Sequence, residues 1–138
     1  MNINIIGAGT WGTTLGCLLE KKDHNIVIWQ RSENKVSNIS VNRIHPNISN
    51  YKIPNSIEFT SELNRLDFNN LTILAVPSHC LADILSKINI NNTRFLIASK
   101  GFEVNLGILQ SELLQQKFQI WKVLSRFYKR IRSRNSQL

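Results

Sequence analysis

The 138-residue sequence has only two cysteines and contains no uninterrupted apolar run of 18 residues. Two cysteines are too few for a disulfide framework, so we expect Cys17 and Cys80 to be buried thiols in a reducing cytoplasm. The absent apolar run argues against a membrane-spanning helix. Glycines from residue 7 interrupt the apolar N-terminus, which argues against a secretory signal. A hydrophobic content of 42% excludes a disordered chain, and the length suits one domain.

Acidic residues are missing from the end of the chain. Residues 1–116 carry ten Lys and Arg against nine Asp and Glu, whereas residues 117–138 carry seven Lys and Arg and no acid. Nearly all of the formal net charge of +8 therefore belongs to the tail. Any interpretation as a nucleic-acid or membrane-surface protein rests on that tail alone.

Short apolar runs alternate with segments of helical periodicity along the chain. The runs predict strands at 2–6, 26–29, 57–59, 71–76 and 95–98. The periodic segments predict helices at 11–21, 34–41, 61–66, 80–88 and 108–117. Residues 42–56, with two prolines and several Asn and Ser, predict a surface loop. This alternation predicts an α/β fold, a Rossmann-like, doubly wound, mostly parallel sheet.

Three glycines follow the first predicted strand in the string NINIIGAGTWGTTLG. Gly7, Gly9 and Gly12 form a GxGxxG pattern that opens the first predicted helix, as in dinucleotide-binding sites. Gly7 suits a tight turn, Gly9 lets a pyrophosphate approach the backbone, and Gly12 lets helix and strand pack closely. The helix N-terminus then offers free N–H groups to the phosphates. The alternative is a glycine turn with a purely steric role.

The end of the second predicted strand bears on the choice of cofactor. An NAD site usually has Asp or Glu there to bind the ribose 2′-hydroxyl. Here Arg31 and Ser32 follow the strand, and Glu33 comes slightly later. A guanidinium group suits a 2′-phosphate, so we expect NADP to be favoured over NAD. The alternative is that Arg31 is a solvated charge.

The segments GAGTWGTTL, VIWQR, KIPNSIEFTSEL, ILAVPSHCLADIL and ASKGFE occur in this order. Over residues 1–125 the chain resembles the N-terminal domain of bacterial NAD(P)-dependent glycerol-3-phosphate dehydrogenase. The combination of GAGTWG, AVPS and SKGFE carries the resemblance. It implies an oxidoreductase of phospholipid biosynthesis that transfers hydride between glycerol 3-phosphate and dihydroxyacetone phosphate.

The resemblance implies a set of cofactor-binding residues: Gly7, Gly9, Thr10, Trp11, Gly12, Arg31, Pro77 and Lys100. Val76 would join Pro77 beside the nicotinamide. Lys100 would also bind the small phosphorylated substrate, since a lysine at a strand end faces the ligand crevice of such a sheet. Without the resemblance, a solvent-exposed lysine would be the simpler interpretation. We expect no metal site, since His24, His45 and His79 lack ligand partners at suitable spacing and are interpreted as structural or solvent-facing.

The family's helical substrate domain, which carries its catalytic lysine, has no counterpart in this sequence. We therefore expect a fragment that binds dinucleotide but is inactive alone, with residues 1–125 as an incomplete cofactor domain. Ser78 lacks the G-x-S-x-G context of a hydrolase nucleophile. Cys80 is interpreted as a small side chain that fills space in the core. The oligomeric state is left open.

Residues 126–138 form a basic tail that departs from the family pattern after KVLS. Codons for residues 127–131, read one nucleotide later, can encode a string close to the family's SFAKE continuation. This predicts an out-of-frame tail, which the coding DNA would test. The alternative function is a non-catalytic chain whose tail binds an anionic membrane or nucleic acid, since apolar residues at 120, 124, 127, 128 and 131 share one helical face.

Overall fold

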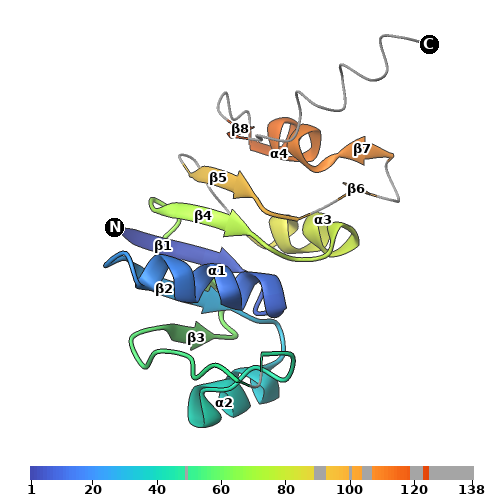
Figure 1. The fold of residues 1–138 in the computed structure, drawn as a ribbon. Coiled ribbons are helices and arrows are strands. Elements are labelled where there is room, and N and C mark those ends of the chain that lie inside the picture. The colour runs from blue at the N-terminus through green and yellow to red at the C-terminus, as the bar shows by residue number, and fades with distance from the viewer. Residues whose placement is uncertain (49, 89–92, 100, 104–106, 119–122, 125–138) are drawn as a thin grey trace, which may run out of the picture.

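The computed structural model of the chain describes residues 1–48, 50–88, 93–99, 101–103, 107–118 and 123–124. Its centre is a six-stranded sheet in the order β3-β2-β1-β4-β5-β8, in which every pair of neighbours is parallel (Figure 1). The strands are β1 Asn2–Ile6, β2 Asn25–Trp29, β3 Glu58–Thr60, β4 Leu71–Leu74, β5 Arg94–Ile97 and β8 Val123–Leu124. The predicted Rossmann-like, doubly wound fold is confirmed.

Among the described residues, four α-helices and one 3-10 turn connect these strands. They are α1 Thr10–Glu20, α2 Glu33–Asn42, η1 Leu63–Arg65, α3 Ser78–Ser86 and α4 Gln110–Phe118. A small antiparallel pair, β6 Phe102–Glu103 with β7 Ile108–Leu109, precedes α4. The sequence did not predict this pair, because two-residue strands leave no periodic pattern. Consequently α4 begins at residue 110 and not at 108.

The central strands bury side chains on both faces of the sheet, which is why their sequences are mostly apolar. In β1, Ile5 belongs to one core cluster and Ile6 to the other, and in β4 Ile73 and Leu74 divide in the same way. The first cluster includes Cys17 of α1 and Ile39 of α2, so these helices cover one face. The other cluster includes residues of α3 and α4, so they cover the opposite face.

The carboxyl ends of the central strands meet at one edge of the sheet. There β1 lies between β2 and β4, so the chain leaves β1 at the point where the strand order reverses. Backbone hydrogen bonds continue beyond the strands, from Gly7 N–H to the Trp29 carbonyl and from Ala75 N–H to the Ile6 carbonyl, at 2.9 and 2.8 Å. Ligands of open parallel sheets bind in the crevice at such a reversal.

The prediction that residues 42–56 form only a surface loop is wrong in part. Ile53 is buried in the core, and its N–H donates to the Arg43 carbonyl at 2.7 Å. The Arg43 guanidinium donates to the carbonyls of Pro54 and Ile57, at 3.3 and 2.8 Å. An arginine with local backbone acceptors thus holds this polar segment against the domain, which its composition does not indicate.

The two thiols differ in exposure. Cys17 is buried, as predicted, whereas Cys80 is only half-buried and departs from the prediction, because it lies in the first turn of α3. Within the described part of the chain, every helix is too short or too polar to cross a bilayer.

Candidate functional site

The turn between β1 and α1 is held by close contacts of two glycines. Gly7 has a φ of +118°, which L side chains rarely adopt, and a Cβ there would lie 2.6 Å from the Ala75 carbonyl oxygen. A Cβ on Gly12 would lie 1.9 Å from the Gly7 carbonyl oxygen. Both glycines are therefore required by packing, whatever the site binds. The predicted position of the motif, at the junction of strand and helix, is confirmed.

Gly9 stands in a different environment from the other two glycines of the motif. Its backbone is extended, with φ −73° and ψ 176°, a conformation open to any residue, and a Cβ there would meet nothing within 4 Å. It is the N-cap of α1 but offers no side-chain cap, and the first turn of α1 holds no acid. The N–H groups of Thr10, Trp11 and Gly12, which precede the first intrahelical bond from Thr13 N–H to the Gly9 carbonyl, therefore have no intrahelical acceptor. Packing gives no reason for a glycine here, whereas an anion seated against the backbone does.

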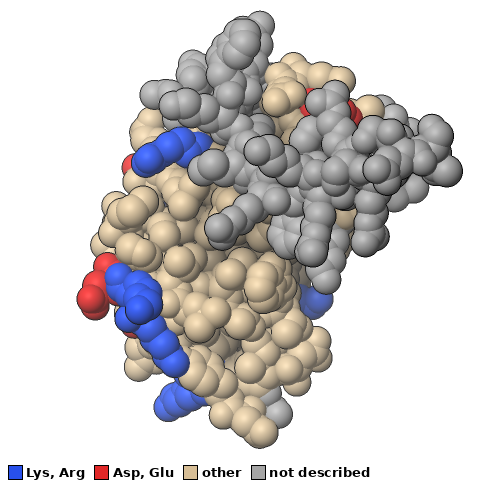
Figure 2. All heavy atoms as spheres, turned by 45° about the horizontal axis from the view of Figure 1, so that its top comes forward, with Lys and Arg blue, Asp and Glu red and all other residues tan. Residues whose placement is uncertain are grey.

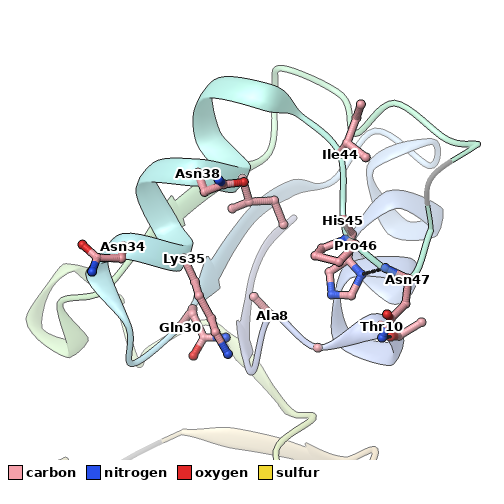
Figure 3. A pocket seen from close by; sticks show the side chains of 12 residues that line it. Ala8, Thr10, Gln30, Asn34, Lys35, Asn38, Ile44, His45, Pro46 and Asn47 are labelled. Atoms are coloured by element: carbon pink, nitrogen blue, oxygen red, sulfur yellow. Dashed lines mark hydrogen bonds between the residues drawn. The ribbon is translucent and has the colours of Figure 1, made fainter.

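Gly9 belongs to the wall of a cavity of about 570 Å³, within the size range of small-molecule sites. The cavity lies between the start of α1, the end of β2, the inner side of α2 and the segment 44–47 (Figure 3). Its lining residues are Ala8, Gly9, Thr10, Gln30, Asn34, Lys35, Asn38, Ile39, Ile44, His45, Pro46 and Asn47.

One wall of the cavity is formed by α2 and the residue after β2. Gln30 continues β2, its N–H donating to the Thr60 carbonyl at 2.9 Å. The Ser32 side chain caps α2 by accepting the N–H of Lys35 at 3.4 Å. The Lys35 side chain reaches from α2 toward Gln30 (Figure 3). The described residues of the cavity lining include one lysine and no carboxylate, so this wall suits an anionic ligand.

The opposite wall was not predicted from the sequence. His45, expected to be structural or solvent-facing, is buried and lines the cavity. Its Nδ1 accepts the N–H of Asn47 at 3.1 Å, so a neutral His45 carries its proton on Nε2. The Asn47 side-chain amide donates to Thr10 Oγ1 at 3.1 Å, which connects this wall to the first turn of α1. A histidine two residues before an asparagine is too common a pattern to have indicated this arrangement.

The other predicted cofactor residues that the structure describes lie outside this lining. Trp11 is 55% exposed on the first turn of α1, and Arg31 is exposed just beyond Gln30. Val76 is buried, and Pro77 is exposed as the N-cap of α3, at the carboxyl end of β4. Lys100, predicted to bind both cofactor and substrate, lies outside the described residues.

The strand ends beside β1 lie close to one another. The Ser99 hydroxyl donates to the Leu74 carbonyl at 3.0 Å, which joins the end of β5 to that of β4. A Cβ on Gly101 would lie 3.9 Å from Ser78 Oγ. Ser99 and Gly101 of the SKG motif therefore lie next to the AVPS motif at the ligand edge of the sheet, although more than 20 residues separate the two motifs in sequence.

Among the described residues, no group of three His, Cys, Asp or Glu side chains is placed to hold a metal ion. His24 Nδ1 lies 3.3 Å from the N-terminal amine, and His79 is exposed. In Figure 2 the basic side chains of the described surface stand in separate groups, one of them beside acidic side chains. The basic tail, with its predicted helical face, lies outside the described residues.

Comparison of the sequence with known proteins supports the predicted resemblance. The family described as NAD-dependent glycerol-3-phosphate dehydrogenase N-terminus matches residues 2–125. Glycerol-3-phosphate dehydrogenase [NAD(P)+] of Thermoanaerobacter sp. (strain X514) is 29% identical over 120 residues, which cover 84% of this chain and 36% of the relative. The enzyme of the same name from Chlamydia trachomatis serovar L2b is 32% identical, with the same coverage. The chain thus spans little more than a third of the length of these relatives.

Solved structures share the fold. The crystal structure of glycerol-3-phosphate dehydrogenase from Coxiella burnetii is similar with a TM-score of 0.77 and 21% identity, over 88% of this chain and 38% of that one. D-mandelate dehydrogenase in complex with NADH is similar with a TM-score of 0.62 and 20% identity, over 89% of this chain and 37% of that one. With the sequence match over residues 2–125, the conclusion is that the chain belongs to the family of the N-terminal part of NAD-dependent glycerol-3-phosphate dehydrogenase.

Proposed function

We propose that the chain binds a nicotinamide dinucleotide in the cavity beside Gly9, as the cofactor-binding part of a glycerol-3-phosphate dehydrogenase. The observation that carries this proposal is the free space over Gly9, at the uncapped N-terminus of α1. Pyrophosphate is the group that such a backbone cradle accommodates, because it accepts several N–H bonds and its charge complements the helix dipole.

Individual residues would hold different parts of the cofactor. Gly9, Thr10 and Trp11 would contact the diphosphate, while Gly7 and Gly12 keep the turn tight. Thr10 is oriented by the Asn47 amide, which leaves its hydroxyl hydrogen free to donate to a phosphate oxygen. His45, with its proton on Nε2, would offer a second donor from the opposite wall.

The nicotinamide end would lie toward the carboxyl ends of β4 and β5. There Val76 and Pro77 would bring backbone against the ring, and Lys100 would contact the cofactor and the substrate. The bound nicotinamide supplies or accepts the hydride in this class of reaction. The substrate pair of the whole protein would be glycerol 3-phosphate and dihydroxyacetone phosphate, in line with the relatives' names.

The preferred cofactor would be NADP, with NAD as a weaker ligand. An NAD site usually has a carboxylate at the end of the second strand, whereas β2 ends in Trp29 followed by Gln30 and Arg31. No described residue of the cavity lining carries a carboxylate that would repel a 2′-phosphate. Arg31, next to the cavity, would add a positive charge.

Equilibrium titration of the full chain with NADPH and with NADH tests this function, monitored by the fluorescence of the reduced nicotinamide. We expect saturable binding of both cofactors, with NADPH bound more tightly. An additional control is adenosine, which lacks phosphates and should compete poorly. If a chain with a folded circular dichroism spectrum bound neither cofactor, the proposed function would be wrong.

A further inference from the structure

Lys35 of α2 lines the cavity, whereas the neighbouring charged residues Arg31 and Glu33 do not. It is the third residue of the helix, and its backbone N–H is the group capped by Ser32. Its side chain lines the cavity and extends toward Gln30 (Figure 3). The cap involves only the backbone of Lys35, so the ammonium group is free for another role.

The Lys35 ammonium has no counter-ion within the described part of the protein. The ion pairs found there join Arg65 to Glu58 and Lys87 to Asp83. Glu33, the acid nearest in sequence, is exposed and does not line the cavity. A cation that lines a concave site without a carboxylate partner attracts an anionic ligand group more strongly than one on an open surface.

The location of this cation determines which part of a dinucleotide it would meet. Gln30 directly follows β2, and the end of the second strand is where the adenosine ribose binds in this fold. The diphosphate cradle at Gly9 lies in the same cavity. A ligand that spans from Gly9 to Gln30 would therefore bring its ribose edge to the Lys35 side chain.

From this geometry we propose that Lys35 distinguishes a 2′-phosphorylated adenosine ribose from an unphosphorylated one. The inference rests on the proposed dinucleotide site and makes Lys35, not Arg31, its main specificity-determining residue. Lys35 lines the cavity, whereas Arg31 lies outside the lining, although both residues are exposed to solvent. Gln30 completes the subsite with an amide that hydrogen-bonds a hydroxyl or a phosphate oxygen equally well.

Five full-length proteins test the assignment: the unchanged chain, Lys35→Gln, Lys35→Arg, Arg31→Gln and, as a matched control, Lys22→Gln. Lys22 is an exposed lysine beyond the C-terminal end of α1, away from the cavity. Each protein is titrated with NADPH and NADH, and then with 2′,5′-ADP and 5′-AMP, which carry the same distinction without nicotinamide. Circular dichroism spectra confirm that the variants remain folded.

We expect Lys35→Gln to weaken the binding of NADPH and 2′,5′-ADP by about tenfold. The affinities for NADH and 5′-AMP should change by no more than about twofold. Arg31→Gln should have a smaller effect on the ratio of the NADPH affinity to the NADH affinity, and Lys22→Gln should have none. Lys35→Arg should retain the preference for NADPH that Lys35→Gln loses. If Lys35→Gln weakened both cofactors equally or neither, or if Arg31→Gln alone changed the ratio, the assignment would be overturned while the dinucleotide site stood. If the unchanged chain bound none of the four ligands, the dinucleotide site and the assignment would both fail.

Discussion

A Cβ atom on Gly12 would lie 1.9 Å from the carbonyl oxygen of Gly7, far inside van der Waals contact. The first turn of α1 therefore rests directly on the backbone that leaves β1. This contact fixes where the helix N-terminus points, and it exists only because residue 12 has no side chain. It also separates the roles within the motif, since Gly9, three residues earlier, meets no such obstacle.

Replacing Gly12 with alanine should unfold or severely destabilise the domain. The added methyl group would overlap backbone atoms, which cannot move aside as a flexible side chain can, so we expect a loss of about 3 kcal/mol or more in the free energy of unfolding. Urea denaturation followed by circular dichroism measures the loss. A Gly12→Ala protein with unchanged stability would contradict the packing described here.

Replacing Gly9 with alanine should leave the stability nearly unchanged and weaken cofactor binding. The backbone there is extended and the space beyond it is empty, so the midpoint of thermal unfolding should change by no more than a few degrees. The methyl group would occupy the place proposed for the diphosphate, and NADPH binding should weaken at least about tenfold. Thermal unfolding and NADPH titration of the same preparation check both parts. Unchanged affinity would place the diphosphate elsewhere.

Replacing Thr13 with valine should stabilise the protein by about 1 kcal/mol. The Thr13 hydroxyl is fully buried and has no hydrogen-bond partner among the described residues, so valine of similar shape removes an uncompensated polar group. The control is Thr72→Val, because Thr72 is equally buried but accepts the Asn4 amide at 3.2 Å, and its replacement should be destabilising. Urea denaturation of both variants gives the comparison. Equal effects would show that the Thr13 hydroxyl does have a partner.

The Cys17 thiol should make stability depend on alkaline pH. Burial, and secondarily the negative charge of Glu20, raises the pKa of Cys17 above its ordinary value, although Lys21 opposes this shift. Above the pKa of a free thiol, about 8.5, the unfolded chain releases a proton that the folded protein retains, so stability falls as pH rises. Below that pH the Cys17 thiol is protonated in both the folded and the unfolded protein, so it causes no loss of stability there.

The free energy of unfolding, measured from pH 7 to 10, should therefore decline less steeply in Cys17→Ala than in the unchanged protein. Cys80→Ala serves as the control and should keep the original slope. Thiol labelling gives a second check, because half-buried Cys80 should react quickly and Cys17 only as the protein opens. Rapid labelling of both thiols in the folded protein would contradict the burial of Cys17.

The order of strands and helices could be predicted from the sequence because it depends on local patterns. Each central strand is buried on both faces and is therefore mostly apolar, while the helices carry a periodic apolar stripe. The glycine motif could also be recognised in the sequence, because its backbone requires glycine. Gly7 has a positive φ, and at Gly12 a side chain would collide with backbone atoms. Membership of the family followed from short strings around these same turns.

The walls of the cavity were decided only by the tertiary structure. Arg31 is closer in sequence to the strand end, but the helical turn that begins at Ser32 places Lys35, and not Arg31, in the cavity lining. Asn47 contacts Thr10 at the start of α1, and His45 lines the cavity beside it. Their segment is held against the domain by the hydrogen bond of Arg43 to the Ile57 carbonyl and by the burial of Ile53. Such placements depend on contacts between residues distant in sequence, and no local propensity or spacing encodes them.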